Sequence, residues 1–159
     1  MKATMLKLTL LRHAKSSWDY PWLEDFLRPL NARGYRQVVN LTDDFPEDVD
    51  EIWCSPAVRA YTSIQGVLRD KPELELKLKD AIYEASARAL IEMLKDGGTL
   101  KHIVLVGHNP GLEELACQLT DSEVRMKTAH AALLELECGN WSELRAGTAR
   151  LIRLYRPEI

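Results

Sequence analysis

The sequence predicts an α/β fold of three layers, α/β/α, in which helices cover both faces of a mostly parallel central sheet. Short, strongly apolar runs predict buried strands, and the amphipathic stretches between them predict the crossover helices that parallel strands require. The two clearest strands, residues 6–11 and 102–106, are apolar enough to be covered on both faces. At 159 residues the chain can bury one sizeable core, so we expect residues 1–159 to form a single domain.

The first strand leads into a loop rich in aromatic residues and proline, and then into a helix. Residues 16–30 show neither the helical nor the strand period of apolar residues, which predicts a loop that carries several bulky side chains. Trp18 and Trp22 in this loop could line a pocket, but we favour a small local core. Asn31 is the expected N-cap of a helix that runs to about residue 43.

The middle of the chain repeats the strand-helix pattern. Residues 50–54 predict a short strand, and Ser55 and Pro56 predict the start of the next helix, with serine as N-cap and proline at the first helical position. Alternating residues 74–78 predict a half-exposed strand near the sheet edge, and residues 85–95 predict a third helix.

The last third predicts one buried strand, one helix and two further strands. The buried strand over residues 102–106 ends in a glycine-proline turn, after which residues 112–119 predict a helix. Residues 131–137 and 148–155 predict the final strands. The sequence contains no internal repeat, low-complexity tract or linker.

Composition excludes several functional classes. A net charge of −3 and a pI near 5.8 give no support for nucleic acid as a partner. The apolar run near the N-terminus is too short to span a membrane and has no cleavage pattern, so we expect no membrane association and a cytoplasmic location. The three cysteines, Cys54, Cys117 and Cys138, are far apart, so we expect reduced thiols that form neither disulfides nor a zinc site.

Basic side chains follow the predicted strands at the sheet edge where such folds bind ligands. Arg12 and His13 come directly after the first strand, and His108 follows the buried strand over residues 102–106. Arg59 lies about one turn into the second helix, near its positive N-terminal end. Arginine matches phosphate oxygens and a neutral imidazole is a nucleophile, so this set predicts phosphoryl chemistry. We expect His102, which begins its strand at the opposite edge, to be structural.

Three blocks of the sequence resemble the histidine phosphatase superfamily. They are residues 11–14 (Leu-Arg-His-Ala), residues 55–59 (Ser-Pro followed by Arg59) and residues 106–110 (Val-Gly-His-Asn-Pro). Residues 15–18 (Lys-Ser-Ser-Trp) and 25–34 look like the short SixA-type branch, the phosphohistidine phosphatases. The blocks span about three-quarters of the chain and keep the family's order.

The resemblance implies a phosphoglycerate mutase-like fold and assigns roles to particular residues. His13 would be the nucleophile, and Arg12, Arg59 and His108 would complete a phosphate pocket that needs no metal or cofactor. Arg28 would be a further contact specific to the branch. Two departures are Ala14, where the superfamily usually has glycine, and the proton donor, which could be Asp80 or Glu84.

The expected mechanism passes through a phosphohistidine on His13, with Arg12, Arg59 and a protonated His108 neutralising the phosphoryl oxygens. An imidazole leaves phosphorus with less need of a general acid than an alkoxide does, so the unclear acid favours N–P bonds. We therefore expect the partner to be a phosphoryl substrate carried on histidine in a protein domain. A small-molecule phosphomonoesterase and a non-catalytic phosphoprotein-binding domain remain alternatives, and the sequence does not predict the oligomeric state.

Overall fold

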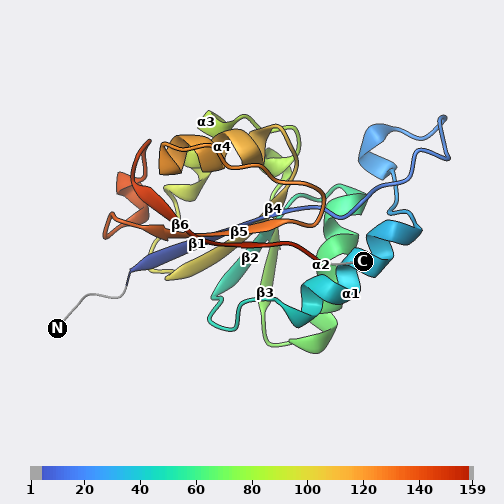
Figure 1. The fold of residues 1–159 in the computed structure, drawn as a ribbon, viewed down its shortest axis with the longest axis horizontal. Coiled ribbons are helices and arrows are strands. Elements are labelled where there is room, and N and C mark those ends of the chain that lie inside the picture. The colour runs from blue at the N-terminus through green and yellow to red at the C-terminus, as the bar shows by residue number, and fades with distance from the viewer. Residues whose placement is uncertain (1–4, 158–159) are drawn as a thin grey trace.

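The computed structural model describes residues 5–157 and has the predicted three-layer α/β/α architecture (Figure 1). The six strands of its sheet lie in the order β3-β2-β4-β1-β5-β6. The first four of these are parallel, and β5 and β6 add an antiparallel edge. Their bounds are β1 (Leu6–Arg12), β2 (Glu51–Cys54), β3 (Glu75–Leu78), β4 (His102–Gly107), β5 (Ala131–Leu136) and β6 (Ala149–Tyr155).

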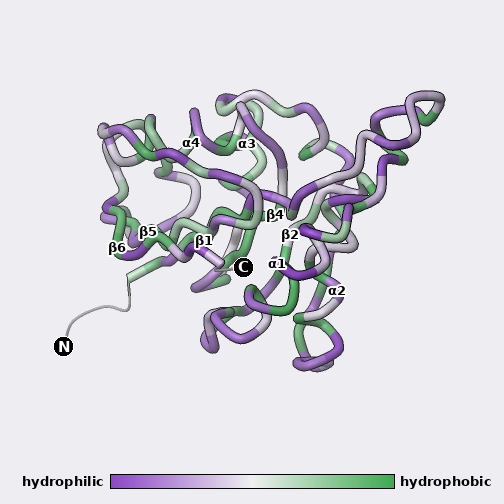
Figure 2. Tube along the Cα trace, turned by 45° about the vertical axis from the view of Figure 1, so that its right-hand side comes forward, coloured by the Kyte–Doolittle hydropathy of each residue, from purple (hydrophilic) through white to green (hydrophobic). Residues whose placement is uncertain are grey.

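Two pairs of helices form the outer layers. On one face lie α1 (Ala32–Asp43) and α2 (Val58–Asp70), and on the other lie α3 (Ala87–Leu94) and α4 (Gly111–Thr120), as Figure 1 shows. In Figure 2, hydrophobic segments concentrate in the sheet, whereas the peripheral loops are largely hydrophilic. None of the helices within residues 5–157 has the length and apolar character needed to cross a bilayer.

The central strands are apolar throughout because each contributes to two cores. Successive side chains of a strand point to opposite faces of the sheet. In β1, Leu8 and Leu10 join the cluster beneath α3 and α4, whereas Leu11 joins the cluster beneath α1 and α2. Likewise in β4, Leu105 and Val106 belong to opposite clusters. This double burial explains why the sequence shows continuous apolar runs here rather than alternation.

The register of the sheet brings three chain segments together at the carboxyl ends of its parallel strands. Arg12 pairs with Gly107, and the backbone N–H of His13 donates to the carbonyl of Gly107 at 3.1 Å. On the other side of β4, the N–H of Ser55 donates to the carbonyl of Val106 at 3.0 Å. The residues after β1, β2 and β4 are thus fixed beside one another by backbone hydrogen bonds.

Two sequence predictions about helix starts have different outcomes. The Asn31 side chain accepts a hydrogen bond from the N–H of Gly34 at 2.9 Å, which confirms it as the cap of α1. The prediction that Ser55 caps the next helix is wrong, because α2 begins at Val58 after Ala57. Arg59 is therefore the second residue of α2.

The loop between β1 and α1 does not form the small aromatic core that we expected. Trp18 and Trp22 are 72% and 76% exposed, and the loop projects from the body of the protein in Figure 1. The loop is held by polar contacts instead, since Arg28 within it is buried and bonded to the backbone of Ser17. Because these polar contacts hold the loop, the rings of Trp18 and Trp22 can remain largely exposed to solvent.

Candidate active site

His13 is positioned at the end of β1 as a neutral imidazole with one free nitrogen. Its Nδ1 lies 2.7 Å from the carbonyl oxygen of Ala14, which can only accept, so Nδ1 carries the proton and Nε2 keeps its lone pair. Burial, together with the nearby charges of Arg59 and Arg12, lowers the pKa of His13 to about 3. Ser63 of α2 holds this backbone turn through the N–H of Ala14 at 2.8 Å. The ring is therefore ready to act as a nucleophile at neutral pH.

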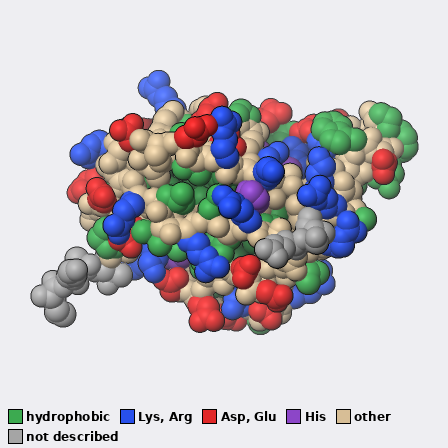
Figure 3. All heavy atoms as spheres, in the orientation of Figure 1, with side chains coloured by type: hydrophobic (Ala, Val, Ile, Leu, Met, Phe, Trp, Pro, Cys, Tyr) green, Lys and Arg blue, Asp and Glu red, His purple; other side chains and the backbone are tan. Residues whose placement is uncertain are grey.

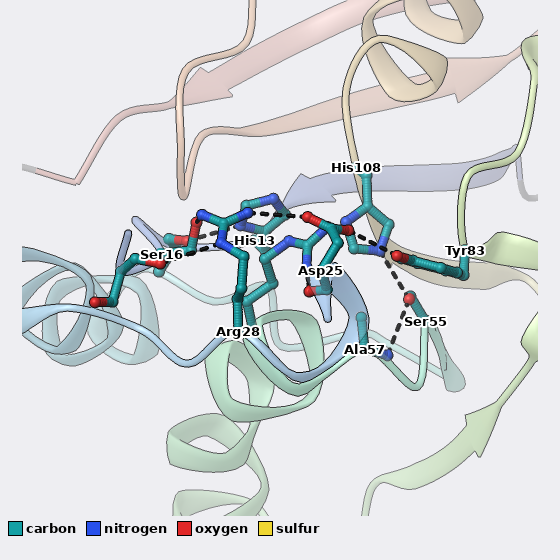
Figure 4. Close-up of polar contacts among 11 residues, drawn as sticks. His13, Ser16, Asp25, Arg28, Ser55, Ala57, Tyr83 and His108 are labelled. Atoms are coloured by element: carbon teal, nitrogen blue, oxygen red, sulfur yellow. Dashed lines mark hydrogen bonds and ion pairs between the residues drawn. The ribbon is translucent and has the colours of Figure 1, made fainter. Parts of the chain in front are cut away.

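His108 lies beside His13, with 5.2 Å between the ring centroids (Figure 4). Its Nε2 lies 2.8 Å from the hydroxyl oxygen of Ser55, which also accepts from the N–H of Ala57. Burial and the charge of Arg59 lower the pKa of His108 to about 4, which favours a neutral ring in the free protein. The protonated ring of the expected mechanism concerns the state with a phosphoryl group bound. When the Ser55 hydroxyl donates to Nε2, the single ring proton resides on Nδ1.

Two side-chain nitrogen atoms at this site are buried and have no hydrogen-bond partner within residues 5–157. They are Nε of Arg12 and Nδ1 of His108. A terminal nitrogen of Arg12 donates to the carbonyl of Met126 at 3.1 Å, which fixes the guanidinium group. Because buried polar groups are normally paired, these two nitrogens at the ends of adjacent strands are suited to donate hydrogen bonds to an anion.

Asp25 ties together both of the other arginines. The Arg59 guanidinium donates to the backbone carbonyl of Asp25 at 2.7 Å and to its carboxylate at 2.9 Å. Arg28 donates to the second carboxylate oxygen at 3.0 Å, and the Tyr83 hydroxyl donates at 2.6 Å (Figure 4). The Tyr83 hydrogen bond, with those of Arg59 and Arg28, lowers the pKa of Asp25 to about 2. In the free protein this single carboxylate thus offsets part of the positive charge of the two arginines.

The Arg28 side chain is buried and has a contact for each of its guanidinium nitrogens. It is buried and donates to the carbonyl of Ser17 at 3.1 Å and to the hydroxyl of Ser16. Its guanidinium carbon lies 3.4 Å from the centroid of the Trp18 ring, which covers it. Arg28 therefore reaches the site at the same carboxylate as Arg59 and links the projecting loop to it.

The two candidate proton donors lie in different surroundings. A cavity of about 620 Å³ opens beside His108 and Arg59, and Glu84 is among its lining residues. Asp80 is not; it is exposed at the start of a short 3₁₀ helix (Asp80–Ile82). The structure thus places Glu84, but not Asp80, at the cavity.

Sequence reasoning missed three residues of the site: Asp25, Tyr83 and the role of Ser55. Asp25 lies in the segment that resembles the SixA-type branch, but nothing local marks its carboxylate as the partner of Arg59. Ser55 was interpreted as a helix cap, and its hydroxyl instead connects His108 to the N–H of Ala57. His102 is structural as expected, since its ring contacts the Thr9 hydroxyl at 2.7 Å and the Asp48 carboxylate at 3.1 Å.

The histidine pair predicts a specific pH dependence of stability. The pKa values of His13 and His108 are lowered to about 3 and about 4 in the folded protein, whereas an unfolded histidine titrates near 6.5. Between about pH 6.5 and pH 4 the unfolded chain therefore binds more protons, so the free energy of unfolding falls as the pH is lowered through this window. Each histidine contributes at most about 1.4 kcal/mol per pH unit.

Urea unfolding at a series of pH values measures this effect. The His13→Ala/His108→Ala variant should show a shallower loss of stability than the unaltered protein between about pH 6.5 and pH 4. Asp25, with its pKa lowered to about 2, contributes below this window and does not obscure it. Parallel curves for the two proteins would show that the histidines are not held neutral by the fold.

Sequence comparisons identify a family and a protein that are similar to this chain. The family model of the histidine phosphatase superfamily (branch 1) matches residues 8–93, more than half of the chain. This stretch contains Arg12, His13 and Arg59, whereas His108 lies beyond it. An uncharacterized chloroplastic protein of Arabidopsis thaliana is 28% identical over 158 residues, which cover 86% of this chain and 69% of that protein.

Solved structures of phosphatases share the fold. A proposed phosphohistidine phosphatase SixA from Nakamurella multipartitia superposes with a TM-score of 0.84 at 20% identity and covers 99% of both chains. The protein histidine phosphatase SixA complexed with tungstate gives 0.76 at 17%, over 96% of this chain and 97% of that one. Phosphoserine phosphatase of Entamoeba histolytica with 3-phosphoglyceric acid gives 0.68 at 16%, over 96% and 98%.

Proposed function

Because the chain belongs to the histidine phosphatase superfamily, and is by family a phosphatase, we propose that it hydrolyses phosphohistidine in a protein domain through a phosphoryl group carried on His13. The observation that carries this proposal is the placement of three side chains, those of Arg12, His13 and His108, at the carboxyl ends of two adjacent parallel strands. Nε2 of His13 has a free lone pair, and the unpaired donors of Arg12 and His108 lie at the ends of the same and the neighbouring strand. A phosphoryl group placed there would satisfy both donors while phosphorus faces the nucleophile.

The proposed reaction has two steps. In the first, Nε2 of His13 forms a bond to phosphorus as the N–P bond of the substrate breaks, and the substrate imidazole leaves as a neutral ring when its other nitrogen carries a proton. In the second, water attacks the phosphoryl group on His13, releasing inorganic phosphate and returning His13 to its neutral form. Arg12, Arg59 and the Nδ1–H of His108 stabilise the charge on the phosphoryl oxygens in both steps.

Arg59 must exchange partners for this chemistry. In the free protein its guanidinium is engaged by Asp25. A phosphoryl dianion carries more charge than a carboxylate and offers three acceptor oxygens, so it can compete for Arg59. Asp25 then keeps Tyr83 and Arg28 as partners, which prevents the carboxylate from being left unpaired near the phosphate.

The identity of the leaving group can be tested through Glu84. An alkoxide leaving group needs a proton from a general acid, whereas a protonated imidazole ring does not. We expect Glu84→Gln to keep the turnover of a phosphohistidine peptide within about threefold and to lower that of an alkyl phosphate by about 10²-fold. Steady-state kcat/KM for the two substrates measures this, with Asp80→Gln as the matched control because Asp80 does not line the cavity.

The same assay separates the proposal from its main rival, a small-molecule phosphomonoesterase. The position of Glu84 at the cavity is the observation that favours this rival. Faster hydrolysis of alkyl phosphates than of phosphohistidine peptides by the unaltered protein would establish the esterase and refute our choice.

Within residues 5–157 no three His, Cys, Asp or Glu side chains are grouped to hold a metal ion. We propose metal-independent catalysis, which unchanged turnover after chelator treatment would support.

A further inference from the structure

A second hollow, separate from the cavity at His108, is lined in part by Arg12. Its volume is about 450 Å³, and its charged lining residues are all basic or histidine. We call it the basic hollow and define it by Arg12, Lys15, Arg33, Lys127 and His130. Figure 3 shows Lys and Arg side chains gathered around histidine on this face of the protein.

Three different parts of the chain supply these basic side chains. Lys15 follows His13 by two residues, Arg33 is the second residue of α1, and Lys127 and His130 lie in the loop before β5. None of the three lysine and arginine side chains outside Arg12 forms an ion pair with another residue in the described part of the chain. The remaining lining residues carry no charge. Among residues 5–157, the hollow therefore presents positive charge that no described acidic side chain pairs with.

The state of His130 is consistent with this concentration of charge. Burial lowers the pKa of His130, and the positive charges of Arg156, Lys127 and Arg12 lower it further. Its Nδ1 accepts a hydrogen bond from the backbone N–H of Lys127 at 3.1 Å, so Nε2 carries the ring proton. Positive charge gathers here although the whole chain has a net charge of −3.

The basic hollow adjoins the candidate active site, because Arg12 belongs to both. The same guanidinium lines the hollow and has its buried Nε unpaired at the catalytic site. A phosphorylated side chain that reaches His13 from a folded domain brings the neighbouring surface of that domain over the hollow. Arg33 and Lys127 are exposed and so can meet a large partner, whereas a small ion is held best by buried, fixed donors.

We propose that the basic hollow is a docking surface for acidic side chains that flank the phosphohistidine of the protein substrate, an inference that rests on the proposed function. Charge complementarity between the basic hollow and an acidic partner increases the association rate and selects among partners, and it changes the chemical step less. The hollow would thus favour phosphohistidines with neighbouring Asp or Glu over the same group in a neutral or basic setting. Substrates too small to reach it would be unaffected.

Charge reversal tests the proposal. In the Arg33→Glu/Lys127→Glu variant both substitutions are at exposed positions, and a glutamate in the first turn of α1 is compatible with the helix dipole. The matched control is Arg69→Glu/Lys101→Glu, which changes the net charge equally at the far ends of α2 and of the loop before β4. Three substrates are compared: free phosphohistidine, a phosphohistidine peptide flanked by glutamates, and the same peptide flanked by glutamines.

We expect the unaltered protein to prefer the glutamate-flanked peptide over the glutamine-flanked one by about tenfold in kcat/KM at low salt. The preference should be lost at about 0.5 M salt, because such a salt concentration screens charges over distances of a few ångströms. The double reversal should remove this preference and leave kcat/KM for free phosphohistidine within about twofold. The control variant should behave as the unaltered protein does.

The outcomes separate the two proposals. Turnover of all three substrates without a preference for flanking glutamates, or a preference that survives the double reversal, would overturn the docking surface alone. Inhibition by a single-stranded oligonucleotide but not by polyglutamate would assign the hollow to nucleic acid and also overturn it. No turnover of any phosphohistidine substrate would refute the proposed function and this partner with it.

Discussion

Replacing His13 with alanine is expected to lower phosphatase turnover by at least about 10⁴-fold and to eliminate the phosphoryl-enzyme intermediate. The variant loses Nε2, the nitrogen whose lone pair is kept free because Nδ1 donates to the carbonyl of Ala14. The arginines and His108 remain, so the variant should still bind a phosphate analogue. Rapid quenching with a ³²P-labelled phosphohistidine substrate measures the intermediate as label on the protein that is stable in base and lost in acid.

His108→Ala is the informative control, because the two rings lie only 5.2 Å apart and either could be the nucleophile on proximity alone. We expect this variant to acquire label slowly, since it loses an Nδ1–H donor to the phosphoryl oxygens but keeps the attacking nitrogen. Label that persists in His13→Ala and is absent from His108→Ala would reverse the two roles. A thermal shift with tungstate establishes that each variant is folded and retains the pocket.

The fold could be predicted from the sequence because its strands are marked locally. The apolar runs at β1 and β4 are long and uninterrupted, since both of their faces are covered, and the helices between strands have clear amphipathic periods. Arg12, His13 and His108 were also predictable, because they follow directly after such strands and parallel strands share one carboxyl edge. For these three residues, the position directly after a predicted strand was enough to place the side chain at the site.

The rest of the site depends on contacts that no local pattern encodes. Asp25 meets Arg59 across 34 residues and Tyr83 across 58 residues, and a carboxylate in a polar loop is ordinarily solvated. Ser55 matched the pattern of a helix cap, but the chain extends through Pro56 and Ala57 before α2 begins. Trp18 was expected to be buried because tryptophan usually is, yet it lies over Arg28 with most of its surface exposed. In each case tertiary context decided between two roles that the residue type allows.

Arg12 distinguishes an anion pocket from a merely basic surface, because its Nε is buried without a partner. A terminal nitrogen of the same guanidinium donates to the carbonyl of Met126 at 3.1 Å, which orients the group. Leaving such a donor unpaired costs the folded protein stability, and an anion that binds there recovers it. Arg12 should therefore contribute to phosphate affinity and to turnover through geometry as well as charge.

Arg12→Ala is expected to lower kcat/KM for the phosphohistidine substrate by about 10³-fold, and Arg12→Lys by about 10²-fold although it keeps the charge. Lysine offers one rotatable ammonium group and cannot reproduce both the Met126 contact and the buried Nε–H donor. Tungstate affinity, measured by thermal shift, should fall in the same order, and Arg69→Lys at the remote end of α2 should change neither quantity. An Arg12→Lys variant that retained full turnover and tungstate affinity would mean that positive charge alone suffices, and the unpaired Nε would then have no role in holding phosphate.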